Sequence, residues 1–312
     1  MKVLIATVCN DLFVPGSLTL LQSLKNNVSN IDNYDVKIYY HDELCKLSDV
    51  NKSKFKKVFP RIKFHRVELP ISPDLCIADS EDRRSAFIKL ECFNEEEYDR
   101  VVFLDSDAIV INDITDVIED ESIKFGYVAG NDRWSREDGP FQQANTGVLF
   151  VGKEYLSGTF EFNGKNQRLY EHCFDCIVSK IGTQRPSMME QNVINTVMSG
   201  YHSTALPSYY NHRIFKTCGN DRGIDITNTK VIHWCMYWRY KPWVTSQEIA
   251  DCASFKENGV VGYPTWEEEV QKYNNSVSHM REQDQPNFIF NKYLEEVNDI
   301  LSPDNAYSNI KG

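Results

Sequence analysis

A run of apolar residues that ends on two aspartates limits most strongly what this chain can fold into. Residues 101–104 are rich in β-branched and aromatic types, which indicates a buried β-strand. Asp105 and Asp107 follow at once, separated by Ser106. A bend at the end of the strand would turn both carboxylates toward one point. Paired carboxylates suit Mg²⁺ or Mn²⁺, although a turn with two solvated acids would have the same sequence.

Short apolar strands alternate with helical patterns along the first 245 residues. We expect strands at 3–8, 34–40, 61–67, 125–129, 145–151 and 231–234, and helices at 18–24, 51–58, 84–93, 167–181 and 190–199. Ser17 is the expected cap of the first helix. This alternation predicts an α/β fold with crossover helices. Ligands of open α/β sheets bind beyond the carboxyl ends of the strands, so the loop at 9–16 and the two aspartates should face one crevice.

Composition narrows the class of protein further. The chain has 312 residues, of which 41% are hydrophobic, and its net charge of −11 argues against nucleic acid as a partner. The apolar runs are too short for a signal peptide or a membrane span. Nine scattered cysteines indicate reduced thiols and a cytoplasmic location. We therefore expect a cytoplasmic protein with a sizeable core.

The last part of the chain differs in composition. From Trp266 onward it turns charged and helical. This change predicts one domain over residues 1–265 and a helical C-terminal extension over 266–312. The charged helices could pack on the domain or on a second copy of the chain, which leaves a homodimer open.

Five segments stand in the same order as in the family-8 retaining glycosyltransferases of the GT-A fold, and the chain resembles the glycogenin-like members of that family. These segments are residues 4–24, 87–117, 145–151, 190–195 and 231–243. One Asp-x-Asp motif turns up in many chains, whereas five segments in family order are much more specific. The resemblance implies a single Rossmann-like GT-A domain with a mixed central sheet, which binds a UDP-sugar.

In that family an Asp-x-Asp pair and a late histidine hold Mn²⁺ against the diphosphate of the donor. The resemblance assigns this role to Asp105, Asp107 and His233, with Mg²⁺ as the alternative ion, and it places Ser106 and Asp105 at the donor. Taken alone, a histidine beside Trp234 would more often be a core residue.

Lys241 matches the lysine of the family's Lys-Pro-Trp segment, which contacts the donor phosphates. The family has a glycine between the histidine and this lysine, but here the glycine is absent and the spacing is two residues longer. Met236 and Arg239 are the candidates to replace that glycine's contact with phosphate.

The N-terminal loop resembles the family's uridine site. Thr7, Asn10 and Phe13 occupy the matching positions, and the family relative has tyrosine where Phe13 stands. An aromatic ring suffices to stack on the base, so that only a hydroxyl contact is lost. Without the resemblance, Asn10 and Asp11 would be read as a simple turn.

A second group of residues matches the part of the family site that surrounds the donor sugar. Asn145 and Thr146 border the hexose, and Gly147 would permit either a close backbone approach or a positive φ. Glu190 and Gln191 stand where the family usually has Asp-Gln. Four residues are therefore expected to act in catalysis: Lys89, Asn145, Glu190 and Gln191; Lys89, Asn145 and Thr146 are also expected to bind the donor.

The predicted function is Mn²⁺-dependent transfer of glucose or galactose from a UDP-sugar, with retention of configuration, to a separate glycan or protein-linked acceptor. A separate acceptor is expected because residues 211–219 contain no tyrosine that could be self-glucosylated, as one is in glycogenin-like members. Two alternatives stay open. A phosphohydrolase of the haloacid dehalogenase type also uses Asp-x-Asp, and a catalytically weak UDP-sugar-binding protein would fit the Glu190 departure.

Overall fold

The structure is a computed structural model that describes residues 1–76, 81–129, 144–179, 190–199, 201–214, 227–235, 241–244 and 281–301, with only the backbone described at 81–83. Its centre is a seven-stranded sheet in the order β10-β6-β7-β4-β1-β2-β3. The strands of this sheet are β1 Val3–Val8, β2 Asp35–Tyr40, β3 Lys63–Arg66, β4 Arg100–Leu104, β6 Phe125–Ala129, β7 Ala144–Gly152 and β10 Thr204–Leu206. A small sheet in the order β11-β12-β5 and a hairpin lie outside it: β5 Ala108–Val110, β11 His212–Arg213, β12 Val231–His233, β8 Thr159–Phe162 and β9 Lys165–Arg168.

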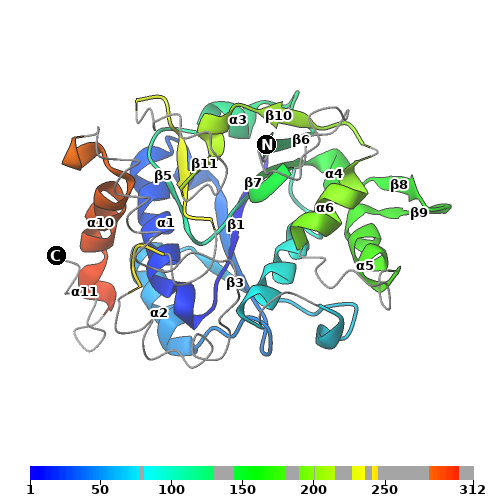
Figure 1. The fold of residues 1–312 in the computed structure, drawn as a ribbon, viewed down its shortest axis with the longest axis horizontal. Helices are drawn as coiled ribbons and strands as arrows, with labels where there is room; N and C mark the ends of the chain where they lie inside the picture. Colours follow the sequence, from blue (N-terminus) through cyan, green and yellow to red (C-terminus); the bar gives the residue numbers. More distant parts are fainter. Residues whose placement is uncertain are drawn as a thin grey trace, which may run out of the picture.

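Helices cover both faces of the central sheet (Figure 1). The α-helices are α1 Val14–Asn27, α2 Asp49–Val58, α3 Thr115–Glu119, α4 Lys153–Ser157, α5 Leu169–Ser179, α6 Glu190–Met198, α10 Pro286–Glu296 and α11 Asn298–Leu301. The 3₁₀ helices are η1 Asp11–Phe13, η2 Ile31–Asn33, η3 Pro73–Leu75, η4 Glu81–Phe93, η5 Ser208–Asn211 and η7 Glu282–Asp284. In Figure 1, α1, α2, α10 and α11 lie on one side of the sheet, and α5 and α6 lie on the other.

Alternating side chains of each strand build two separate cores. Val3 and Ile5 of β1 belong to the cluster that includes α1 and α10, whereas Leu4 and Ala6 belong to the cluster that includes η4, α5 and α6. This is the two-residue period of a β-strand with both faces buried. The sheet therefore forms the middle layer between two layers of helices.

β4 occupies a central position in this sheet. It pairs in parallel with β1 and antiparallel with β7, and all five of its residues are buried. Because both of its faces are covered, β4 has the unbroken apolar sequence from which it was predicted. The α/β fold with a mixed central sheet is thus confirmed, and the carboxyl end of β4 points toward the aspartates.

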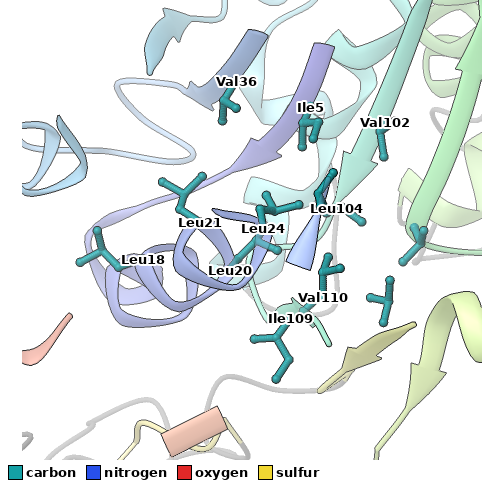
Figure 2. Close-up of a cluster of buried hydrophobic side chains, with 14 of the residues drawn as sticks. Ile5, Leu18, Leu20, Leu21, Leu24, Val36, Val102, Leu104, Ile109 and Val110 are labelled. Atoms are coloured by element: carbon teal, nitrogen blue, oxygen red, sulfur yellow. The ribbon is translucent and has the colours of Figure 1, made fainter. Parts of the chain in front are cut away.

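α1 anchors the first strand to the strands around the aspartates. Leu20, Leu21 and Leu24 lie toward residues of β1, β2, β4 and β5 (Figure 2). All four leucines of the helix are at most 1% exposed: Leu18, Leu20, Leu21 and Leu24. Burial of one such side chain stabilises a fold by about 1.5–3 kcal/mol. This packing fixes the start of α1 close to the aspartates.

The sequence-based start of this helix was wrong. The helix begins at Val14, and Ser17, which we expected as its cap, is fully buried inside it. Pro15 lies in the first turn, where a missing N–H group costs no hydrogen bond. The side-chain cap lies further upstream, at the short helix η1 that leads into α1. There the side chain of Asn10 accepts hydrogen bonds from the N–H groups of Leu12 and Phe13.

The described C-terminal helices pack on the domain itself. Phe290 of α10 is fully buried and stacks on Trp243 with ring centroids 5.5 Å apart. The indole N–H of Trp234 donates to Asn287 Oδ1 at 2.9 Å. The boundary expected near residue 265 lies outside the described residues, so the division into domain and extension stays a prediction. None of the described helices is long and apolar enough to cross a membrane.

Candidate active site

The chain turns sharply where β4 ends. The N–H of Asp105 still donates to Gly147 O of β7 at 2.8 Å, and the N–H of Ala108 then donates back to Asp105 O at 3.0 Å. This turn interrupts the extended chain between β4 and β5. It brings the carboxylates of Asp105 and Asp107 toward one point, as the bend inferred from the sequence requires.

His233 completes a group of three ligands. β12 pairs antiparallel with β5, and this pairing sets His233 opposite Ala108. His233 Nε2 lies 3.2 Å from Asp107 Oδ1 and 3.6 Å from Asp105 Oδ2. One ligand atom from each of the three residues lies within 4.8 Å of the others. Two carboxylates and an imidazole suit Mn²⁺ or Mg²⁺, so the residues present fit the ion that the family resemblance implies.

Two buried lysines compensate the negative charge. Lys241 Nζ binds the carboxylate of Asp107 and the backbone oxygen of Trp234. Lys89 Nζ lies 2.9 Å from Asp105 Oδ1 and 3.1 Å from Glu190 Oε1. Each aspartate thus forms an ion pair with its own lysine. The family resemblance places Lys89 near the Asp-x-Asp loop, but it did not predict these ion pairs.

The environment drives the pKa values of the two aspartates in opposite directions. Burial raises the pKa of Asp107, but the charge of Lys241, together with that of His233 when its ring is protonated, outweighs burial and holds this pKa well below its usual range. Burial also raises the pKa of Asp105, where the charge of Asp107 adds to it and Lys89 opposes it, and the net change is upward. Asp107 is therefore the more firmly ionised ligand of the pair.

The residues expected around the sugar gather beside this group. Thr146 Oγ1 donates to Glu190 Oε1 at 3.3 Å, and Asn145 Nδ2 donates to Gln191 Oε1 at 3.3 Å. These contacts join the start of β7 to the start of α6. Glu190 is 5% exposed, and its second oxygen, Oε2, has no hydrogen-bond partner among the described residues.

The residues expected at the uridine site lie on β1 and in the loop that follows it. Thr7 is buried, and its hydroxyl has no hydrogen-bond partner within the described part of the chain. Phe13 meets Trp243 edge to face at 5.8 Å, and Lys241 Nζ lies 6.0 Å from the Phe13 ring centre. A methyl group on Gly16 would collide with Ser106 O and with Trp243. The loop and the aspartates are thus neighbours, as predicted.

Sequence reasoning missed two contributors to this site. Asn211 is 2% exposed and contacts His233, but its sequence surroundings resemble an ordinary loop. Trp243 is the tryptophan of the Lys-Pro-Trp segment, and its ring packs against Phe13. Its place in this segment was the signal that could have identified it as part of the site. Met236 and Arg239 lie outside the described residues, so their contact with phosphate stays a prediction.

Gly147 supplies space rather than an unusual backbone angle. Among the described glycines only Gly164 has a positive φ, so the alternative of close approach holds for Gly147. A Cβ atom on Gly147 would overlap the imidazole ring of His233. The absence of a side chain here lets the histidine reach the aspartates.

Replacing Gly147 with alanine should therefore displace His233 and weaken Mn²⁺ binding by about 10–100-fold, the range seen when a metal ligand loses its support. Titration followed by the electron paramagnetic resonance signal of free Mn²⁺ measures this. Gly164→Ala is the matched control, because its φ of +76° makes alanine strained although the space around it is open. The control should lose stability and keep its Mn²⁺ affinity. Unchanged affinity in Gly147→Ala would refute the steric argument.

The fold resembles those of several known glycosyltransferases. The galactosyltransferase LgtC in complex with donor and acceptor sugar analogues superposes with a TM-score of 0.55 at 16% identity, over 81% of this chain and 94% of LgtC. The glycosyltransferase GlyE of Streptococcus pneumoniae TIGR4 gives 0.55 at 14% identity, over 96% of this chain and 64% of GlyE. The bifunctional glycosyltransferase WbbM gives 0.54 at 16% identity over 82% of this chain, which spans about half (51%) of WbbM.

These likenesses show the fold, which is the mixed α/β architecture of GT-A glycosyltransferases. Among curated protein sequences, none matches this chain. The sequence model described as glycosyl transferase family 8 matches residues 4–247, which is most of the chain. The chain therefore belongs to glycosyltransferase family 8.

Proposed function

We propose that the protein is a Mn²⁺-dependent retaining hexosyltransferase that moves glucose or galactose from a UDP-sugar to a separate glycan or protein-linked acceptor. One observation carries the proposal: Asp105, Asp107 and His233 converge at the carboxyl end of β4, with Lys241 beside them, in a chain of glycosyltransferase family 8. The structural likeness to LgtC, a galactosyltransferase, supports a hexose donor. Mg²⁺ is the alternative ion.

At the metal, Asp105, Asp107 and His233 would hold the cation. A bound divalent cation neutralises negative charge that develops on the leaving diphosphate. Lys241 is buried beside Asp107 and supplies a second positive charge close to the same point. A fixed ammonium group there stabilises a departing phosphate more effectively than water does, because the site has a lower dielectric constant.

At the nucleoside, Thr7, Asn10 and Phe13 would bind the uridine. The ring of Phe13 offers an aromatic surface for the base, and Trp243 packs against that ring in an edge-to-face arrangement. The hydroxyl of Thr7 is buried without a partner in the described part, and a bound nucleoside would provide one. Asn10 uses its side-chain oxygen to cap η1, which leaves its amide nitrogen for a ligand.

At the sugar, Glu190, Gln191, Lys89 and Asn145 would orient the hexose. The Glu190 Oε2 atom lacks a partner among the described residues and can accept a hydrogen bond from a sugar hydroxyl. The ammonium group of Lys89 lies 3.1 Å from the other oxygen, Glu190 Oε1, and balances the negative charge of this carboxylate. Retention of configuration rests on family membership, because the described residues do not identify a nucleophile.

Product analysis with purified protein tests the proposal. The protein is incubated with UDP-glucose or UDP-galactose and Mn²⁺. NMR spectra then follow the first product that forms when the hexose is transferred to an acceptor or to water. The expected product keeps the α-configuration of the donor, and EDTA abolishes its formation. An inverted product, or full activity in EDTA, would refute the proposal.

The same assay separates the two alternatives. A phosphohydrolase would release inorganic phosphate, whereas a transferase releases UDP. A weak UDP-sugar-binding protein would bind UDP in the presence of Mn²⁺, as calorimetry can measure, without turning over any donor. Glu190 in place of the family's aspartate is the observation that favours this second alternative. The cytoplasmic location and the homodimer stay predictions from sequence.

A further inference from the structure

Asn211 connects the metal-ligating histidine to the sugar side of the site. It is the last residue of η5 and is 2% exposed. Its Oδ1 lies 3.0 Å from His233 Nδ1, and its Nδ2 donates to Asn145 Oδ1 at 2.8 Å. Asn145 Nδ2 in turn donates to Gln191 Oε1. Three side-chain amides thus form one hydrogen-bonded chain that ends on the imidazole ring.

Backbone N–H groups fix the direction of this chain. The N–H of Gly147 contacts Asn145 at 3.1 Å, and because this group can only donate, the atom that it meets must be the Asn145 oxygen. That oxygen also faces Asn211, which must therefore present its NH₂ group there. The remaining atom of the Asn211 amide, its oxygen, is the one that faces His233.

An amide oxygen beside Nδ1 determines where the imidazole carries its proton. The oxygen only accepts, so His233 must donate from Nδ1–H. In the neutral ring, the lone pair then resides on Nε2, which is the nitrogen that lies 3.2 Å from Asp107 Oδ1 and 3.6 Å from Asp105 Oδ2. A lone pair aimed at two carboxylates is repelled by them unless a cation lies between them, and this is the arrangement that a metal ligand needs.

We propose that Asn211 is a positioning residue that holds His233 in the Nδ1–H tautomer and directs its Nε2 lone pair at the metal position. The proposal rests on the metal site of the proposed function. Groups that orient a metal-bound histidine through its second nitrogen typically contribute about 10–100-fold to metal affinity, and we expect a contribution of this size from Asn211. Gly147 leaves space for the His233 ring, and Asn211 determines which ring nitrogen carries the proton.

Two variants of Asn211 separate positioning from packing. Asn211→Asp keeps an oxygen that accepts the Nδ1 proton, whereas Asn211→Leu has a similar size and cannot accept. We expect the leucine variant to lose about 10–100-fold in Mn²⁺ affinity. The aspartate variant keeps the acceptor for Nδ1 but sets its other oxygen against Asn145 Oδ1, so we expect it to bind Mn²⁺ more tightly than the leucine variant, whether or not it reaches the affinity of the original protein. A residue that only filled space would tolerate leucine better than a buried charge.

The readout does not depend on enzyme activity. Long-range ¹H–¹⁵N correlation spectra of the metal-free protein, recorded at a pH where the histidine rings are neutral, report which ring nitrogen of each histidine is protonated. His233→Gln identifies the signal of interest. The original protein and Asn211→Asp should show His233 protonated on Nδ1, and Asn211→Leu should lose this preference. Mn²⁺ alone, titrated with detection by electron paramagnetic resonance, then measures affinity.

Asn27→Leu is the matched control. Asn27 Nδ2 donates to Val110 O of β5 at 2.8 Å, so this change loosens the same small sheet without touching His233. It should leave the tautomer and the Mn²⁺ affinity unchanged. A neutral His233 ring that carries its proton on Nε2 in the original protein, or an unchanged tautomer and affinity in Asn211→Leu, would overturn the proposal. If the tautomer is as expected but the original protein binds no Mn²⁺, the proposed function fails instead.

Discussion

Replacing Asp107 with asparagine is expected to lower metal-dependent sugar transfer by about 10³-fold or more. Asp107 contacts both His233, at 3.2 Å, and Lys241, so it joins the metal position to the positive charge beside it. Asparagine has nearly the same shape, which limits any change in packing. The change removes a charged ligand and leaves the buried ammonium group of Lys241 beside a neutral amide.

Initial rates over a range of Mn²⁺ concentrations measure this effect. If asparagine only weakens metal binding, high Mn²⁺ restores part of the rate, and if the charge itself is needed, the rate stays low at saturation. Asp49→Asn is the matched control, because this carboxylate at the start of α2 has a 96% exposed side chain and lies outside the site. A rate within tenfold of the original at every Mn²⁺ concentration would contradict the assignment of Asp107.

Local sequence alone predicts only one part of the site, the end of β4 with its two aspartates. An unbroken apolar run followed by two aspartates identifies both the strand and the turn, because each depends on neighbouring residues. The strand that follows was not predicted as a separate element. β5 has three residues and pairs with β12, which is also three residues long and lies far away in sequence. A strand this short leaves almost no periodic pattern. The equally short β12 was expected at 231–234, but nothing in the sequence indicated that it pairs with β5.

The contacts between charged groups also escaped sequence analysis. The family resemblance placed Lys241 at the donor phosphates, and it gave no sign that this lysine binds Asp107 in the free protein. Asn211 was overlooked for a similar reason, since its function depends on Asn145 and His233, to which only the fold brings it close. Side-chain partners that are distant in sequence are set by tertiary structure, whereas residue types and spacing only restrict the possibilities.

The start of α1 shows how local rules compete. Ser17 has the chemistry of a helix cap, but the helix starts at Val14, four positions before the expected start at Leu18. Pro15 suits a first turn, and Asn10 caps the short helix η1 that precedes α1. The error matters little for the site. In both descriptions the chain after β1 leads to the point where Ser106 and Gly16 meet.

Replacing Lys89 with methionine is expected to lower the free energy of unfolding by about 3–5 kcal/mol, the cost of removing one partner from a buried ion pair. The lysine side chain is 4% exposed and bridges Asp105 and Glu190. Burial lowers the pKa of Lys89, but the charges of these two carboxylates outweigh burial and raise it above its ordinary value. Titration of the lysine itself therefore leaves this contribution intact below about pH 10.4, the unfolded pKa, and removes it as the pH rises through the raised folded pKa.

Urea unfolding of Lys89→Met tests this expectation, and its dependence on pH identifies the cause. Without the lysine, two buried carboxylates repel each other and take up protons more readily, so the destabilisation should shrink as the pH falls. Adding Glu190→Gln to Lys89→Met removes one of these charges and should recover part of the loss. Lys63→Met is the control, since Lys63 pairs with Asp35 at 2.8 Å but is 52% exposed, and it should cost at most about 1 kcal/mol. If Lys89→Met costs no more than this control, the lysine does not hold the two carboxylates together.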